Sequence, residues 1–167
     1  MNFDSKLVFL ADTTNHTITV RKKFAAGRQL VWDCHTKQDY LDRWFAPEPL
    51  TTKTKHMDFR PGGYWHYAMI EPQGQEYWSR LDYQTIDPID RYIALDGFTD
   101  ETGTVNPDMP QANWEVTFSD ASGHTLVQTV ITYRSAEDLG KVIAMGMEAG
   151  LTSTLERLDK LLLTLEK

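Results

Sequence analysis

Residues Ser135 to Lys167 read SAEDLGKVIAMGMEAGLTSTLERLDKLLLTLEK, and the rest of the chain is organised around this segment. Its apolar residues recur at steps of three and four, which predicts one long amphipathic helix. Gly146 and Gly150 lie inside it, where a glycine destabilises a helix by roughly 1 kcal/mol relative to alanine. We therefore expect a close approach or open space at these glycines. The apolar face comprises Leu139, Ile143, Met147, Leu151, Leu155, Leu158, Leu162 and Leu165.

The composition predicts one globular domain. The chain has 167 residues, of which 41% are hydrophobic and five are tryptophan. A chain of this size buries about 70% of its unfolded surface. The net charge is −7, and Lys and Arg form no cluster, so we expect no nucleic-acid partner. The single cysteine, Cys34, predicts a buried apolar side chain rather than a disulfide or a catalytic thiol.

The N-terminus predicts a cytoplasmic protein. The first fifteen residues lack the basic segment and the long apolar core of a signal peptide. No stretch reaches the length of a transmembrane helix, so we expect no membrane insertion.

Upstream of the final helix, short strands alternate with turns. Residues 17–20 alternate and are β-branched, and helical spacing follows at residues 27–35 and 37–44, before Pro47 and Pro49. The segregation of helices from strands predicts an α+β fold, with one domain over residues 1–167 and an N-terminal extension at residues 1–15. Residues 99–111 predict a long loop. The later strands fall at residues 51–59, 64–70, 76–86, 91–98, 114–118 and 125–133.

Aromatic residues gather on one face of the predicted sheet. Strand alternation places Trp65, Tyr67 and Met69 together, and we expect Trp78 and Trp114 to join them on the concave face. These rings can fill the core completely or line a cavity. Their polar tips, opposite a helix that carries glycines, favour a lined cavity.

The sequence holds no recognised catalytic motif and no spacing that gathers metal ligands, so we expect no catalytic residue, metal or cofactor. His66 alternates onto the face opposite Trp65, where we expect it to be exposed. Asp58 and Arg60 predict an ion pair at a strand end. The other charges recognised within strands, Glu76, Arg80, Asp82 and Glu115, are expected on the solvent side.

Three segments together resemble the bacterial proteins called activator of heat-shock protein 90 ATPase homologues, in the START-like (SRPBCC) superfamily. They are VWDCHTKQDYLDRWFAP at Val31–Pro47, DFRPGGYW at Asp58–Trp65 and GMEAGLTSTLERLDKLL at Gly146–Leu162. The resemblance covers the chain from about Thr17 onward. It implies a helix-grip fold like that of the birch-pollen allergen, in which a curved seven-stranded antiparallel sheet surrounds a long C-terminal helix. Two short helices follow the first strand.

The resemblance also implies a site for a small hydrophobic molecule of lipid, polyketide or aromatic type, between the sheet and the last helix. The loop over residues 97–111 would lie near its opening. The chain departs from the family at Ala26-Gly27, where Ala-Pro is frequent, and at Leu151, where Trp is common. The implied wall comprises Trp44, Phe45, Trp65, Tyr67, Met69, Trp78, Trp114, Met147 and Leu151.

Two alternatives stay open beside a binding protein. A cyclase or hydrolase of the same superfamily would need an ionisable group turned into the cavity. An interaction module would use its surface for a chaperone of the stress response or for a homodimer, and would need an exposed apolar patch. The eukaryotic activator carries a separate chaperone-binding domain ahead of this module, for which we expect no room in this chain.

Overall fold

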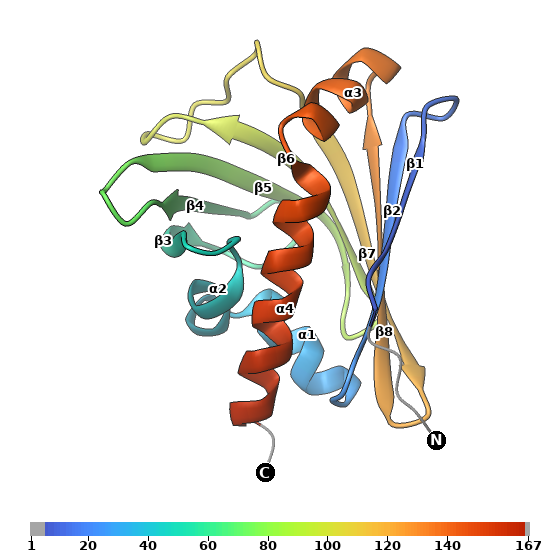
Figure 1. Cartoon of the computed structure of the whole chain (residues 1–167). Coiled ribbons are helices and arrows are strands. Elements are labelled where there is room, and N and C mark those ends of the chain that lie inside the picture. Colours follow the sequence, from blue (N-terminus) through green and yellow to red (C-terminus); the bar gives the residue numbers. More distant parts are fainter. Residues whose placement is uncertain (1–5, 166–167) are drawn as a thin grey trace.

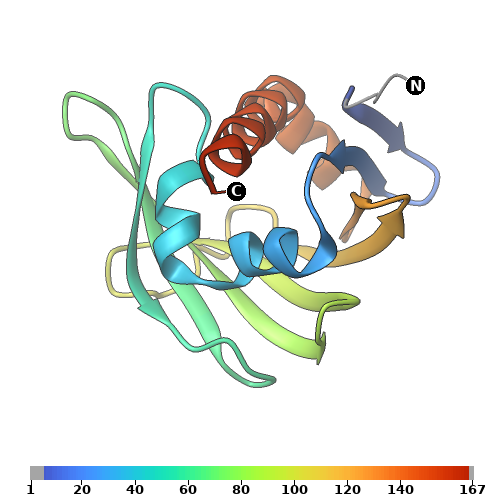
Figure 2. The ribbon, with the colours of Figure 1, turned by 90° about the horizontal axis from the view of Figure 1, so that it is seen from below.

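The computed structural model describes residues 6–165. Within them, one antiparallel sheet of eight strands curves around a C-terminal helix (Figures 1 and 2). The strand order is β1-β2-β8-β7-β6-β5-β4-β3, so β1 and β3 form the edges. The strands are β1 (Val8–Asp12), β2 (Thr17–Phe24), β3 (Thr51–Met57), β4 (Tyr64–Ile70), β5 (Glu76–Asp87), β6 (Arg91–Thr99), β7 (Ala112–Ala121) and β8 (His124–Tyr133).

The strand that exceeds the expected seven is β1, which lies within the predicted N-terminal extension. It pairs with β2 through a tight turn, in which the Asp12 side chain accepts hydrogen bonds from the backbone N–H groups of Thr14 and Asn15. The prediction of seven strands is therefore wrong. Residues 1–5 of the extension lie outside the described residues.

The C-terminal stretch forms two helices, α3 (Ala136–Ala144) and α4 (Met147–Leu165), rather than one. The Gly146 N–H donates to the Ile143 carbonyl, and the backbone of Gly146 has a φ of +90°. Only glycine adopts this left-handed conformation without steric cost, and it commonly ends a helix. The prediction of one continuous helix is wrong at Met145–Gly146 for this reason. The Ser135 hydroxyl caps the start of α3 by accepting from the Asp138 N–H.

Two short helices, α1 (Arg28–Thr36) and α2 (Gln38–Trp44), follow β2 as predicted and close one end of the space between the sheet and α4 (Figure 1). Trp32 of α1 packs edge-to-face against Phe118, with the ring centroids 5.1 Å apart. Leu158 and Leu162 of α4 are buried in the same cluster. Cys34 is buried as predicted, and burial raises the pKa of its thiol to about 12.

An ion pair fixes α4 over the sheet. Lys22 points inward from β2 and is only 5% exposed, and its Nζ lies 2.9 Å from Oδ2 of Asp159 on α4. Burial raises the pKa of Asp159, against the opposing effect of Lys22.

None of the helices in residues 6–165 has the length and apolar character needed to cross a membrane.

Candidate ligand-binding cavity

A cavity of about 330 Å³ lies between the sheet and the N-terminal half of α4. The sheet contributes most of its aromatic wall, while α3, α4 and the link between them form the opposite wall. The residues from the sheet are Tyr67, Met69, Tyr77, Ser79, Leu81, Tyr92, Asp96, Phe98, Trp114 and Tyr133. The helical side comprises Val142, Met145, Gly146, Met147, Gly150, Leu151 and Thr154, and Phe45, Pro47 and Pro110 complete the lining.

The two helix glycines leave open space rather than allow a close approach. A Cβ atom added at Gly146 or at Gly150 would meet no heavy atom within 4 Å. Gly150 lies inside α4 and donates its N–H to the Gly146 carbonyl, while the Thr154 hydroxyl donates to the Gly150 carbonyl at 2.8 Å. The helix therefore stays regular at Gly150 while presenting no side chain to the cavity.

Six of the nine residues expected in the wall line this cavity together. Trp65 instead lies in the packed core, where its ring stacks on that of Tyr67 with centroids 3.8 Å apart. Trp44 lines a smaller, deeper cavity of about 40 Å³ and donates its indole N–H to the Cys34 carbonyl. The six that line the larger cavity are Phe45, Tyr67, Met69, Trp114, Met147 and Leu151.

The expected position of Trp78 on the concave face is wrong. Trp78 pairs with Ala68 across β4 and β5, which places it on the face opposite Trp65 and Tyr67. Its ring lies beside His66, at a centroid distance of 4.9 Å. The register of the β4–β5 hairpin decides the face, because a shift of one residue exchanges the two faces of a strand.

His66 lies on the outer face of the sheet, yet it is buried, so the expectation that it is exposed is wrong. The loop after β6 covers it, and its Nε2 lies 3.2 Å from the Asp100 carbonyl oxygen. Burial lowers the pKa of His66. Arg80 shares this face and donates to Asp82 and to the Gly103 carbonyl, at 2.6 and 3.1 Å.

Two ion pairs involve charges that the sequence analysis singled out. Arg60 pairs with Asp58 as predicted, at 2.5 Å. Arg91 and Glu115 pair at 3.0 Å, and both side chains are more than a third exposed, so Glu115 lies on the solvent side.

Among the cavity residues that sequence reasoning missed, Asp96 is the one with an ionisable carboxyl. It alternates with Ala94 and Phe98 on the concave face of β6, and its Oδ2 accepts a hydrogen bond from Trp114 Nε1 at 3.0 Å. Burial raises the pKa of this carboxyl to about 7. The sequence did contain a signal for this residue, because a carboxyl in the inward-facing series of an alternating strand is unusual.

Three tyrosines surround the polar end of the cavity. Tyr67, Tyr92 and Tyr133 are each at most 6% exposed, and burial raises the pKa of each hydroxyl, so all three stay neutral. The negative charge of Asp96 adds to the raised pKa of Tyr67 and Tyr133. The Tyr133 hydroxyl lies 3.7 Å from Sδ of Met147, which is a weak acceptor.

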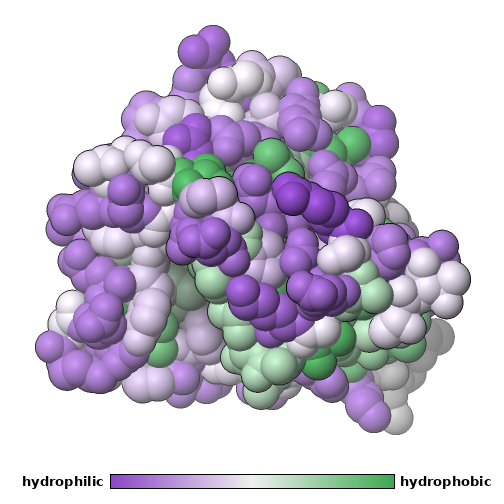
Figure 3. All heavy atoms as spheres, turned by 90° about the horizontal axis from the view of Figure 1, so that it is seen from above, coloured by the Kyte–Doolittle hydropathy of each residue, from purple (hydrophilic) through white to green (hydrophobic). Residues whose placement is uncertain are grey.

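The cavity opens between the α3–α4 link and β5. Met145 and Tyr77 line it and are also 54% and 48% exposed, so they form its rim. Phe98 and Pro110, at the two ends of the loop expected near an opening, also line it. Figure 3 shows apolar residues among hydrophilic ones on the upper surface, where the molecule is hollowed.

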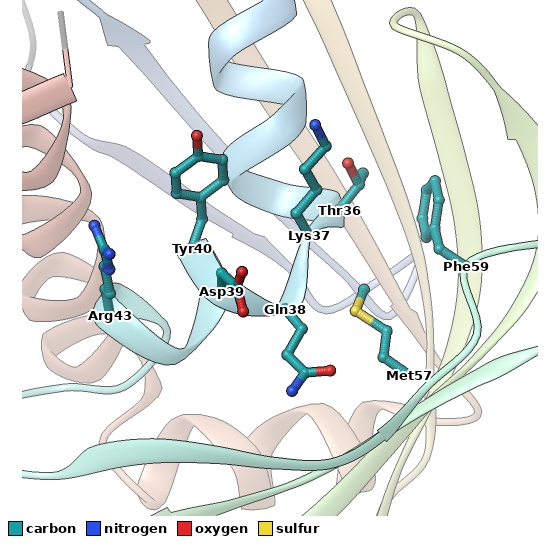
Figure 4. A pocket seen from close by; sticks show the side chains of 8 residues that line it. All are labelled: Thr36, Lys37, Gln38, Asp39, Tyr40, Arg43, Met57 and Phe59. Carbon is teal, nitrogen blue, oxygen red and sulfur yellow. The ribbon is translucent and has the colours of Figure 1, made fainter.

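A second hollow lies beside the α1–α2 junction and β3 (Figure 4). Its volume is about 590 Å³, but it is lined by exposed polar side chains such as Lys37, Gln38 and Arg43. These side chains point away from one another in Figure 4, so they converge on no common point. The aromatic cavity between the sheet and α4 is therefore the candidate site.

The curved sheet, the gripped helix and the cavity between them define a START-like helix-grip protein. The model of the family described as "Activator of Hsp90 ATPase homolog 1-like protein" matches residues 25–163, so the chain belongs to this family. Proteins with this START-like fold commonly bind ligands.

Solved structures show the same fold. Protein Ms6760 from Mycobacterium smegmatis is 30% identical, with a TM-score of 0.87 over 94% of this chain and 97% of that one. A protein from Arthrobacter aurescens is 25% identical, with a TM-score of 0.86 over 91% and 88% of the two chains. The AHSA1 protein from Silicibacter pomeroyi, at 19% identity, a TM-score of 0.70 and coverage of 90% and 99%, supports the fold alone. The comparison with curated proteins found no match.

Proposed function

We propose that this protein binds a small hydrophobic molecule of lipid, polyketide or aromatic type in the cavity between its sheet and α4. The observation that supports this most is a partly enclosed space of about 330 Å³ with a largely aromatic and aliphatic lining. Small-molecule sites in proteins span about 300–1,000 Å³ and are predominantly apolar. The ligand would contact Phe45, Tyr67, Met69, Trp114, Met147 and Leu151.

Gly150, in the first turn of α4, also supports a binding role, because it presents no side chain to the cavity. Glycine weakens a helix by roughly 1 kcal/mol relative to alanine, and Gly150 shows no neighbour that a Cβ atom would strike. Since packing does not require this glycine, the space that it leaves is a better reason for its presence. A bound apolar ligand would restore the van der Waals contacts that the residues around the open space lack.

A fluorescence titration with the apolar dye N-phenyl-1-naphthylamine tests the proposal. Leu151→Trp places a large ring in the cavity, and Leu163→Trp is the matched control, since Leu163 lies on the same helix and is 76% exposed. We expect the unmodified protein to bind the dye, Leu151→Trp to bind it at least tenfold more weakly, and Leu163→Trp to bind it unchanged. An unmodified protein that leaves the dye fluorescence unaltered, or equal affinity in all three proteins, would overturn the proposal.

Asp96 favours a second candidate, a cyclase or hydrolase that uses the same cavity. Its carboxyl lies in the cavity wall with a pKa raised to about 7, which suits a general acid or base at neutral pH. Hydrolysis of p-nitrophenyl esters by the unmodified protein, abolished in Asp96→Asn, would favour the enzyme. The absence of any turnover with these esters and with cyclisable polyketide mimics would favour the binding protein.

A chaperone-binding surface has less support. The large exposed apolar side chains described for this chain are spread over β1, α3, the cavity rim and the end of α4, rather than gathered in one patch. They are Val8, Leu10, Tyr77, Ile143, Met145 and Leu163.

A further inference from the structure

The polar end of the cavity carries charge of one sign only. Asp96 is its single ionisable carboxyl, and none of the residues that line the cavity is Lys, Arg or His. Above pH 7, where Asp96 is ionised, a ligand with a carboxylate head would therefore bring a second negative charge beside it with no cation to balance it. Like charges repel strongly where water is excluded, so at this pH the cavity disfavours fatty-acid-type ligands.

The Asp96 carboxyl has capacity for another hydrogen bond. Its Oδ2 accepts from Trp114 Nε1 at 3.0 Å, and no other donor within residues 6–165 reaches this carboxyl. An ionised carboxylate accepts up to about four hydrogen bonds. The concave face of β6 is otherwise apolar around it, with Ala94 and Phe98 as its neighbours on that face. Placing a carboxyl there is costly unless a partner satisfies it.

Aromatic rings surround this carboxyl. Asp96 lies directly opposite Ala112 on β7, and Ala112 in turn lies opposite Tyr133 on β8, so a small residue separates the carboxyl from the tyrosine. The rings of Tyr67, Tyr92 and Trp114 also line the cavity. The face of an aromatic ring attracts a cation, most strongly when the cation has left water.

From these contacts we infer that the cavity selects an apolar molecule whose head is a protonated amine, with Asp96 as the anionic partner and the surrounding rings as the walls. This inference rests on the proposed function and names the class of ligand for the same site. The ammonium donates to the free oxygen of Asp96, while the apolar body extends toward Met147 and Leu151. The raised pKa of Asp96 in the empty cavity is consistent with a carboxyl that lacks its cationic partner.

The charge of the whole chain also suits this ligand class. The net charge is −7, and the rim tyrosine, Tyr77, donates a hydrogen bond to Glu71, which places a carboxylate near the mouth. A negative surface potential raises the local concentration of cations and increases their association rate. Anionic ligands would be repelled from the same mouth.

Three probes with one apolar body and different heads test the inference: 4-phenylbutylamine, 4-phenylbutanol and 4-phenylbutyrate. Their affinities are measured by displacement of N-phenyl-1-naphthylamine at low ionic strength and at pH 8, where Asp96 is ionised. We expect the amine to bind at least tenfold more tightly than the carboxylate, with the alcohol between them. Equal affinities, or tighter binding of the carboxylate, would overturn the inference.

Two variants assign the selectivity to Asp96. Asp96→Asn should reduce amine binding at least tenfold while the alcohol and the dye still bind. Asp120→Asn removes the same charge at an exposed position on β7 and should leave the order of the probes unchanged. An unchanged amine preference in Asp96→Asn would overturn the inference. If the dye and all three probes fail to bind the unmodified protein, the proposed function itself fails, whereas dye binding without head selectivity removes only the inference.

Discussion

The two ends of the space under α4 are built from similar residues and yet differ in packing. At the end closed by α1 and α2, Trp32, Phe118 and Leu158 pack without a large void. At the end beneath the α3–α4 link, equally aromatic strands border a cavity of about 330 Å³. The difference comes from the helical side of the space. At the closed end α4 supplies Leu158 and Leu162, whereas at the other end Gly146 of the α3–α4 link and Gly150 of α4 leave room beside Leu151. Aromatic content alone therefore does not tell a core from a binding site.

Replacing a leucine with alanine at each end of α4 should distinguish the packed end from the cavity end most clearly. Leu158 is fully buried, so Leu158→Ala removes packed atoms and should lower the free energy of unfolding by about 3–5 kcal/mol. Leu151 borders the cavity, and Leu151→Ala should cost roughly half as much or less, because fewer contacts are lost. Urea unfolding of both variants at one pH measures the difference. Equal costs would mean that the space beside Leu151 is filled in solution.

The pH dependence of stability tests the polar end of the cavity. The pKa of Asp96 is raised to about 7 in the folded chain, against about 3.9 when unfolded. Between these values Asp96 holds a proton in the folded state that it has released in the unfolded state, so the contribution of Asp96 to stability falls as pH rises from 4 to 7 and then levels off. Asp96→Asn lacks this titration, so its stability relative to the unmodified protein should rise by roughly 2–4 kcal/mol between pH 4 and pH 8.

Unfolding of both proteins in urea at several pH values checks this expectation. Tyr67, Tyr92 and Tyr133 stay neutral throughout the range, since burial raises the pKa of each, and the lining residues from α3 and α4 do not titrate. A constant difference between the two proteins from pH 4 to pH 8 would show that Asp96 titrates normally, which contradicts its burial in an apolar wall.

The smallest expected effect concerns the helix glycines. Gly150→Ala should stabilise the protein by up to about 1 kcal/mol, because alanine favours the helix and its Cβ meets no neighbour. Gly140→Ala in α3 is the matched control, since Gly140 also shows no neighbour within 4 Å but does not line the cavity. Both variants should gain stability, and only Gly150→Ala should weaken dye binding. A loss of stability in Gly150→Ala would indicate a close approach at this glycine after all.

Much of the fold could be predicted from local signals. The α1 and α2 helices, and the turns at Gly62 and Gly74, follow from apolar spacing and from glycines that adopt positive φ. The break at Gly146 could not be found by spacing, because Met147 and Leu151 keep the helical period on its far side. β1 was missed as a strand because it is a short edge strand with little buried surface, and its pattern of burial is weak.

The candidate site was less predictable, for a different reason. The face that Trp78 occupies depends on the register of the hairpin between β4 and β5, which residue types alone do not fix. The burial of His66 depends on a loop that returns over the outer face. Asp96 could have been found, since alternation along β6 places it between Ala94 and Phe98 on one face.

The most direct test of a ligand cavity is a crystal structure of the protein purified from cells without refolding. We predict electron density for a small molecule between Tyr67, Asp96 and Leu151, with the cavity open as described. A space closed by rotated side chains of Met69, Trp114 or Met147, with no such density, would contradict the account.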